Sequence, residues 1–351
     1  MKRKYLGFAL FLIILGVSIE ITIYAQAEKN TTTRVVVGKT SEYLYQSIQD
    51  AINYAPPGST IYISSGIYNE ALMITKPLTI IGENKDNTIL ASTSEKNSYA
   101  LQVTANTVVI NQLSITNQGT GLYATGIKIT GSHTLLEHCS FYNTPIGIAL
   151  WSSDNIIRSC SFQNCSDEGI ALLGSNIQPV TNNQILNCVF INNCDGIELQ
   201  HSFNTYISTC SFLMNTHAGI DCIGTGNSKI TINQCIFTEN PVFGIYLSGS
   251  SYCEIISCSF KQSNLKIIRS FNTMISACTF DKEPETCESV TMMHCTYYGE
   301  PKSTLPEQNS KNSFGYQEKI NQYSSRLPSK IMSKIKTFIQ SIRIRLQRVT
   351  I

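Results

Sequence analysis

The chain has 351 residues, of which 42% are hydrophobic and 14% are charged, and its formal net charge is +2. A chain of this length and apolar content can bury a large core, which excludes an intrinsically disordered protein. The charge is unevenly spread, because residues 28–325 carry 16 Lys and Arg against 23 Asp and Glu, whereas residues 326–351 carry seven basic residues and no acidic one. Duplex DNA and RNA require a basic stripe, so we do not expect nucleic acid as a partner of this acidic body.

The N-terminal residues predict export. Basic residues at positions 2–4 precede an apolar run over residues 5–19, and Ala25-Gln26-Ala27 offers a small-residue cleavage site, so residues 1–27 are expected to be a secretory signal. The alternative is an uncleaved anchor formed by residues 5–19, although this run is short for a span of about 20 residues. Both interpretations predict a secreted, periplasmic or cell-surface protein.

The segment that follows predicts the start of a β-rich domain. Residues 28–40 are polar and are expected to form a flexible lead. Ile48, Ala51 and Ile52 then recur at helical spacing before a Pro-Pro-Gly stop, which predicts a short capping helix. Apolar runs separated by Gly and Pro predict strands at residues 60–63, 71–74, 78–81 and 88–90.

Residues 99–298 are repetitive. Gly-Ile dipeptides recur at spacings of 21 to 27 residues, which is the length of one solenoid turn, and each turn contains three short apolar runs. We therefore predict an all-β, parallel solenoid over residues 41–298 with three strands per turn and about nine to ten turns. A second repeated pattern is a Cys, one residue and an aromatic, which occurs at Cys139/Phe141, Cys160/Phe162, Cys188/Phe190, Cys210/Phe212, Cys235/Phe237, Cys258/Phe260, Cys278/Phe280 and Cys295/Tyr297.

The cysteines are not expected to form a disulfide framework. In a strand, the Cys and the aromatic two residues later point to the same side, which the large aromatic side chain identifies as the interior. The eight repeated thiols, and Cys222 in another inward position, are therefore predicted to lie in the core. The remaining four, Cys165, Cys194, Cys253 and Cys287, are expected to be exposed.

The repeat ends at Tyr298. Residues 299–325 are polar and indicate a linker, and residues 326–351 place apolar residues on one helical face with basic residues elsewhere, which predicts a cationic amphipathic helix. Such a helix either caps the open end of the solenoid or binds an anionic membrane surface.

Four N-terminal motifs carry a resemblance to a known class of proteins: Ser47-Ile48-Gln49-Asp50-Ala51-Ile52, Pro57-Gly58-Ser59-Thr60-Ile61, Gly66-Ile67-Tyr68-Asn69-Glu70 and Lys76-Pro77-Leu78-Thr79-Ile80-Ile81-Gly82-Glu83. Together with the repeats, they resemble right-handed parallel β-helix proteins of the pectin-lyase-like class over about residues 40–298. Within that class the chain is most similar to the NosD-type β-helix and to the carbohydrate-binding and sugar-hydrolysing domains. These motifs are structural and many activities share them. The catalytic motifs of polygalacturonases and pectin methylesterases are missing, so the resemblance does not decide whether the chain is an enzyme.

Aligning the turns on their Gly-Ile dipeptides gathers acidic residues on one face of three consecutive turns. The position before Gly is acidic in two turns, and so is the outward position two residues after Gly. These residues and the nearby histidine are the candidates for acid/base catalysis: Asp167, Glu168, Asp195, Glu198, His217 and Asp221.

Stacked turns lie about 4.8 Å apart, so like charges there repel by about 3 kcal/mol per pair at a dielectric constant of about 20. Ca²⁺ held by Glu198 and Asp221 would offset this repulsion, and so would imidazole groups or carboxyl groups with a raised pKa suited to acid/base chemistry on a glycan. The alternative is a solvated acidic patch whose side chains splay apart.

Other side chains are candidates for binding. The aromatic and imidazole groups of Trp151, His201, Phe243 and Tyr246 are candidates for contacting a sugar. Met293 and His294 are soft ligands of the kind that copper prefers.

These observations predict a monomeric, exported protein that binds an extended polysaccharide or surface glycan along a lateral groove. If the protein is an enzyme, we expect a lyase-like or hydrolase-like activity on that glycan. Two alternatives stay open: a NosD-like accessory protein for copper-site maturation, and a non-catalytic surface spacer or adhesin.

Overall fold

The computed structural model describes residues 33–92, 98–119, 121, 124–287 and 289–298. All of them lie in one compact unit, Met1–Gly299, and a second unit comprises Glu300–Ile351. The predicted signal at residues 1–27, the linker at 299–325 and the basic helix at 326–351 lie outside the described residues.

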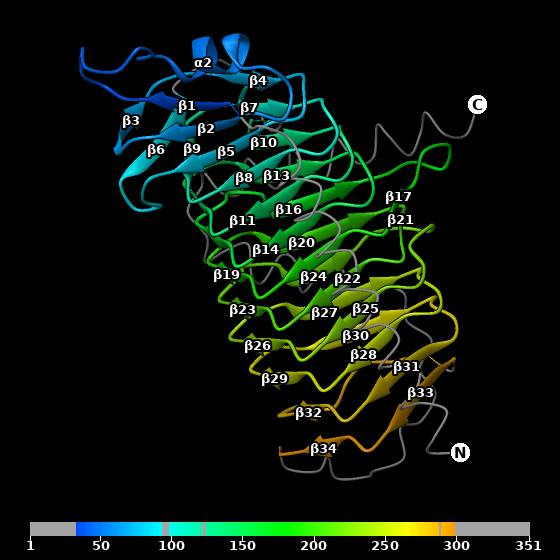
Figure 1. Cartoon of the computed structure of the whole chain (residues 1–351). Coiled ribbons are helices and arrows are strands. Elements are labelled where there is room, and N and C mark those ends of the chain that lie inside the picture. Colours follow the sequence, from blue (N-terminus) through cyan, green and yellow to red (C-terminus); the bar gives the residue numbers. More distant parts are fainter. Residues whose placement is uncertain (1–32, 93–97, 120, 122–123, 288, 299–351) are drawn as a thin grey trace, which may run out of the picture. The chain divides into compact units, whose positions relative to one another are not determined.

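The described residues form a parallel β-helix of about ten turns (Figure 1). Each turn in the middle of the β-helix contributes one strand to each of three long sheets, and neighbouring strands in a sheet come from successive turns. Within the described residues, the sheets contain 12, 11 and 9 strands because the turns at the two ends are incomplete. The all-β fold and the three strands per turn that the sequence predicts are therefore confirmed.

The three long sheets, here called A, B and C, and one short sheet contain all the strands of the described residues. In chain order, sheet A consists of β1 (Arg34–Val37), β2 (Thr60–Ile63), β5 (Thr79–Gly82), β8 (Val109–Asn111), β11 (Leu135–Glu137), β14 (Ile156–Arg158), β18 (Gln184–Leu186), β22 (Tyr206–Ser208), β25 (Thr231–Asn233), β28 (Glu254–Ile256), β31 (Thr273–Ser276) and β33 (Val290–Met293). Sheet B consists of β3 (Gly66–Tyr68), β6 (Thr88–Ser92), β9 (Ser114–Asn117), β12 (Ser140–Tyr142), β15 (Ser161–Gln163), β19 (Val189–Ile191), β23 (Ser211–Leu213), β26 (Ile236–Thr238), β29 (Ser259–Lys261), β32 (Thr279–Phe280) and β34 (Thr296–Tyr297). Sheet C consists of β4 (Leu72–Ile74), β7 (Tyr99–Val103), β10 (Thr125–Ile129), β13 (Ile146–Leu150), β16 (Glu168–Leu173), β20 (Asp195–Gln200), β24 (Ala218–Cys222), β27 (Phe243–Ser248) and β30 (Leu265–Ile268), and the short sheet pairs β17 (Val180–Thr181) with β21 (Ser202–Phe203).

The helix α2 (Ile48–Tyr54) packs at the N-terminal end of the β-helix (Figure 1), as the helical spacing predicts. Ser47 is its N-cap, and the carboxylate of Glu70 accepts hydrogen bonds from the Ser47 hydroxyl and from the first two N–H groups of the helix at 2.8 to 3.1 Å. The Glu of the Gly66–Glu70 motif is therefore explained by helix capping. Among the described residues, no helix is long and apolar enough to cross a membrane.

The flexible lead predicted at residues 28–40 contains a strand instead. Residues Arg34–Val37 form β1 and pair in parallel with β2, and Val35 and Val37 are buried. The β-helix thus begins before residue 41. The prediction failed because Val35-Val36-Val37 is a short apolar run that does not alternate with polar residues, so it lacks the periodicity of a half-buried strand.

A file of stacked side chains fills the interior. The rings of Phe141, Phe162, Phe190, Phe212, Phe237, Phe260 and Phe280 stack with centroids 4.8 to 4.9 Å apart. This separation equals the spacing of strands in a sheet, so equivalent residues of successive turns lie directly over one another. The seven cysteines from Cys139 to Cys278 in the repeated position are buried free thiols, Cys295 is half-buried, and Cys222 is also buried.

Two of the four cysteines expected at the surface are buried. Cys165 and Cys253 are each 1% exposed, whereas Cys194 and Cys287 are half-buried. Cys253 directly precedes a strand of sheet A, where Ile230 is buried in the preceding turn, and Cys165 occupies a corner whose equivalents in other turns are buried asparagines. The corners of the solenoid therefore direct side chains inward, which strand alternation alone does not predict.

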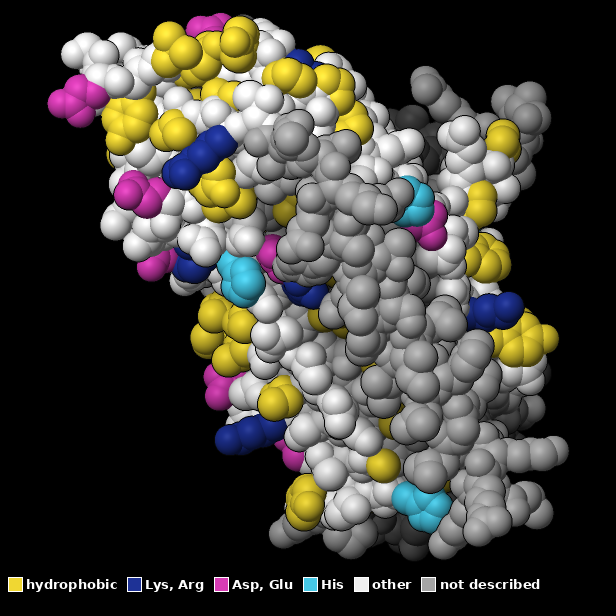
Figure 2. Space-filling model, in the orientation of Figure 1, with side chains coloured by type: hydrophobic (Ala, Val, Ile, Leu, Met, Phe, Trp, Pro, Cys, Tyr) yellow, Lys and Arg dark blue, Asp and Glu magenta, His cyan; other side chains and the backbone are white. Residues whose placement is uncertain are grey.

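The surface carries charges of both signs. On the face shown in Figure 2, Lys and Arg side chains of the described residues are interspersed with Asp and Glu. The described part of this face therefore has no continuous basic stripe.

Candidate functional site

Six polar residues lie on three consecutive strands of sheet C or directly before them, with Asp167 preceding β16 and His217 preceding β24. We call them the acidic cluster: Asp167, Glu168, Asp195, Glu198, His217 and Asp221. The register of β16, β20 and β24 makes Glu168 the partner of Asp195, and Glu198 the partner of Asp221. Because adjacent strands lie about 4.8 Å apart, the carboxyl groups that the sequence alignment brings to one face are close neighbours.

His217 connects two carboxylates of the acidic cluster. Its Nδ1 lies 2.8 Å from Oδ1 of Asp195 and 3.6 Å from Oδ2 of Asp221. His217 directly precedes β24, and its backbone N–H donates to the carbonyl of Cys194 at 2.9 Å, which fixes the start of this turn on the preceding one. The imidazole therefore lies between an acidic residue of the preceding turn and one of its own.

Several carboxyl groups of the acidic cluster are withdrawn from water. Glu168, Asp195 and Asp221 are 7%, 6% and 2% exposed. One oxygen of Glu168 and one of Asp221 are buried without a hydrogen-bond partner. Burying such groups unpaired is costly, so this arrangement favours either protons or a cation.

The pKa values follow from this burial. Burial, together with neighbouring carboxylates, raises the pKa of Asp167 to about 6, of Glu198 to about 7 and of Asp221 to about 8, and it also raises the pKa of Glu168. Burial alone would lower the pKa of His217, but its hydrogen bond to Asp195 and the surrounding carboxylates raise it to about 9. Groups that exchange protons near neutral pH are typical of sites that carry out acid/base chemistry, although structural clusters share this property.

Two aromatic residues adjoin the acidic cluster on the next turn. Within β27, Phe243 pairs with Ala218 and Tyr246 pairs with Asp221. The two rings stack with centroids 4.8 Å apart. The rings of His217 and Phe243 are nearly perpendicular, and their centroids are 5.8 Å apart. The structure therefore extends the polar cluster with a half-buried aromatic surface.

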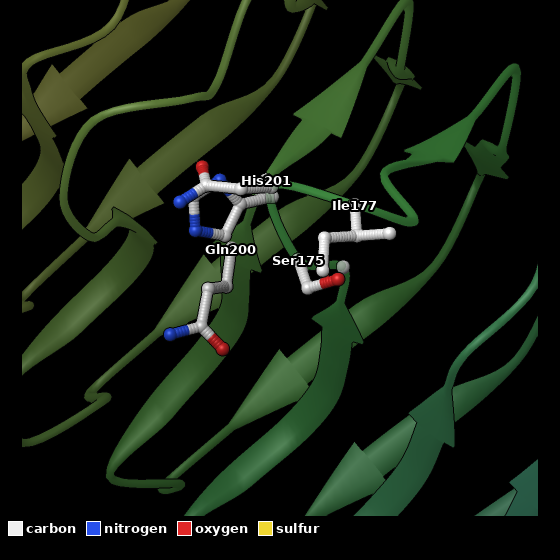
Figure 3. Close-up of a pocket in the computed structure, with 6 residues that line it drawn as sticks. Ser175, Ile177, Gln200 and His201 are labelled. Atoms are coloured by element: carbon white, nitrogen blue, oxygen red, sulfur yellow. The ribbon is translucent and has the colours of Figure 1, made fainter. Parts of the chain in front are cut away.

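The other two binding candidates lie apart from the acidic cluster. His201 follows the far end of β20, where it and Gln200 face a hollow of about 380 Å³ together with Ser175 and Ile177 (Figure 3). Trp151 follows β13 and is 53% exposed; it lines a second hollow of about 620 Å³ with Lys128.

The copper candidates are exposed at the last turn of the described residues. Met293 is 42% exposed and His294 is also exposed, while their neighbours Met292 and Cys295 pack against the core. Within the described residues, the one group of three or more His, Cys, Asp and Glu side chains placed to hold a metal is Asp195, His217 and Asp221. Copper binding at Met293 and His294 therefore stays a prediction.

The sequence alignment missed two features. Cys194 lies two residues before the Gly of its turn, as Asp167 and His217 do in theirs, so it lies between them along the face. Aligning the turns on Gly could have found this position from the sequence. Glu137 and Arg158 form an ion pair of 2.7 Å on sheet A, where Asn111 donates to Glu137 at 3.0 Å. The three side chains occupy one position on successive strands, which the short strands of sheet A make hard to align from sequence.

Comparisons with known proteins agree on the fold. Residues 78–233 match the family model described as a right handed beta helix region, and no curated protein matches the chain in sequence. An alginate lyase from Paenibacillus sp. is similar in structure with a TM-score of 0.54 and 17% identity over 76% of this chain and 100% of its own. Two further proteins are similar in structure. A pectate lyase has a TM-score of 0.55 and 13% identity over 79% of this chain and 83% of its own. The A-module of a mannuronan C-5 epimerase from Azotobacter vinelandii has a TM-score of 0.50 and 12% identity over 72% of this chain and 89% of its own. The fold is thus a right-handed parallel β-helix, as the sequence motifs predict.

Proposed function

We propose that this right-handed parallel β-helix binds an extended polysaccharide across the outer face of sheet C. The half-buried members of the acidic cluster, Asp167, Glu198 and His217, and the adjoining aromatic pair form the contact, and the more deeply buried carboxyl groups lie behind them. The observation that carries the proposal is that five carboxyl groups and one imidazole gather on three successive strands and the residues directly before them, next to the stacked rings of Phe243 and Tyr246.

The chemistry of these groups suits a sugar. Carboxylates accept hydrogen bonds from hydroxyl groups, and an aromatic face packs against the apolar face of a pyranose ring. The spacing of about 4.8 Å between strands is close to the length of one sugar residue. A polysaccharide that runs along the β-helix axis would therefore place one sugar residue against each turn. The similar proteins support this class of ligand, since three of them are an alginate lyase, a pectate lyase and a mannuronan epimerase module.

The carboxyl groups of adjacent strands could also process the glycan. In retaining glycoside hydrolases the two catalytic carboxyl groups are about 5 to 5.5 Å apart, which is close to the strand spacing. We infer that Glu198 and Asp221, which are register partners, would form such a pair.

A glycan array probed with the full chain, with and without Ca²⁺, tests binding first. The affinity for the best glycan is then measured by calorimetry for Glu198→Gln and Phe243→Ala, with the exposed Glu239→Gln and Phe203→Ala as matched controls. We expect the first two variants to lose at least about tenfold in affinity, or about 1.4 kcal/mol, and the controls to bind normally. Equal affinity in all four would reject this face as the binding site.

Turnover is tested separately, by measuring the release of new sugar ends from the same glycan. Alanine at Glu198 and Asp221 should abolish it. Unchanged turnover would place the catalytic groups elsewhere.

A further inference from the structure

Three side chains of the acidic cluster present metal-binding atoms to one point. Nδ1 of His217 lies 2.8 Å from Oδ1 of Asp195 and 3.6 Å from Oδ2 of Asp221, and one atom from each of the three residues lies within 4.8 Å of the others. Two atoms bound to the same tetrahedral Zn²⁺-like ion, with bonds of about 2.0 to 2.2 Å, are about 3.3 to 3.6 Å apart. Small side-chain rotations would therefore give the three atoms a common ion.

The strands hold these ligands in place. Asp195 begins β20 and Asp221 lies within β24, and the two strands are paired in register, with Glu198 opposite Asp221. Ligands on paired strands are more rigidly placed than ligands on loops, because the sheet hydrogen bonds fix their backbones.

A second observation points to a cation that the described residues do not supply. Asp221 is 2% exposed, yet its Oδ1 has no hydrogen-bond partner. Among the described residues, the ion pairs that involve the five carboxyl groups of the acidic cluster are both made by His217. A single imidazolium neutralises one carboxylate, so wherever more than one of the five groups is ionised, negative charge remains. A buried oxygen without a hydrogen-bond partner adds a free-energy cost that a bound cation would remove.

The donor set selects the kind of ion. Ca²⁺ prefers six to eight oxygen ligands, whereas an imidazole with two carboxylates suits borderline ions such as Zn²⁺. Three protein ligands also leave at least one position for water or a hydroxyl group, as in catalytic zinc sites.

We propose that Asp195, His217 and Asp221 form a binding site for one borderline divalent ion, of which Zn²⁺ is the type. The site differs from the Ca²⁺ pair expected at Glu198 and Asp221, because it uses the imidazole and Asp195. It goes beyond glycan binding, and it does not depend on it.

The test uses the full chain, freed of metal with a chelator, dialysed and kept reduced. Calorimetry and elemental analysis after dialysis should show one Zn²⁺ per chain and binding of Ca²⁺ at least about tenfold weaker. His217→Ala and Asp221→Asn should each weaken Zn²⁺ binding by at least about tenfold, a loss that even outer contacts of a metal site can cause. His201→Ala is the matched control and should bind as the parent does.

Two further variants distinguish loss of the imidazole ligand from misfolding and from capture of the ion by a thiol. His217→Asn keeps a side chain that can donate to Asp195 but removes the imidazole, so it should fold as the parent does and still lose Zn²⁺. Cys194→Ser removes the neighbouring thiol; it should retain the ion, and the Co²⁺ form of the parent should lack a thiolate charge-transfer band.

The absence of stoichiometric Zn²⁺, retention of the ion by both His217 variants, loss of the ion in Cys194→Ser, or a preference for Ca²⁺ would each overturn the proposal. Glycan affinity is measured on the metal-free chain, so a failure of one proposal leaves the other intact.

Discussion

The interior stack of rings makes a quantitative prediction for Phe212→Ala. Phe212 is 0% exposed and lies between the rings of Phe190 and Phe237, each with its centroid 4.8 Å away and nearly parallel to it. Truncating a buried Phe to Ala typically costs about 3 to 5 kcal/mol through lost burial and the cavity that remains. Stacking on both faces adds to the loss, since an aromatic pair contributes about 0.5 to 1.5 kcal/mol beyond its area. We therefore expect a loss in the upper part of that range.

Equilibrium urea unfolding followed by circular dichroism under reducing conditions measures this loss. The matched control is Phe203→Ala, nine residues upstream in β21 and 38% exposed, which should cost less than about 1 kcal/mol. Because solenoids can unfold in stages, hydrogen exchange in β23 and its neighbouring strands should show where protection is lost. If Phe212→Ala costs no more than Phe203→Ala, the stacked rings do not hold the turns together and the packing argument is wrong.

Three other changes test the capping, the close packing and the electrostatics. Gly196→Ala should destabilise the chain by several kcal/mol and lower the urea midpoint accordingly. The reason is that the added Cβ would lie 2.5 Å from the carbonyl oxygen of Gly219 in the next turn and 2.7 Å from the ring of Phe212. A midpoint within error of the parent would contradict this. Glu70→Gln should cost about 1 to 2 kcal/mol in the same assay, because a charged acceptor of two helix N–H groups is lost, whereas the exposed Glu42→Gln should be neutral. Burial raises the pKa of Glu198 from 4.5 to about 7, so the stability that its protonated form contributes is complete below pH 4.5 and is lost as the pH rises to 7. In the metal-free chain, the melting temperature of Glu198→Gln should therefore fall less than that of the parent between about pH 5 and 8. An equal fall in the two proteins would refute this.

Residue spacing was sufficient for most of the fold because a solenoid is a repeat of local contacts. Phe190 and Phe212 share a position in successive turns, and each ring meets the equivalent ring of the next turn. Where a residue departs from the repeat, its spacing along the chain no longer predicts its structure. The strand at Arg34–Val37 precedes the repeat, and Cys165 and Cys253 lie at corners whose inward direction depends on the backbone turn.

The candidate site divides in the same way. Counting residues from Gly169 and Gly196 was enough to place the acidic residues on one face, since their positions recur with the length of a turn. The folded chain was needed to show that the His217 imidazole meets Asp195 and Asp221, because the backbone at each Gly shifts the alternation of side chains and the rotamers set the final distances. The folded chain also places His201 and Trp151 beside separate hollows, with His201 about 20 Å of extended strand from Asp195 and about 10 Å from Glu198. Spacing along the chain identifies which turns are neighbours, but the direction of each side chain is fixed by the folded backbone.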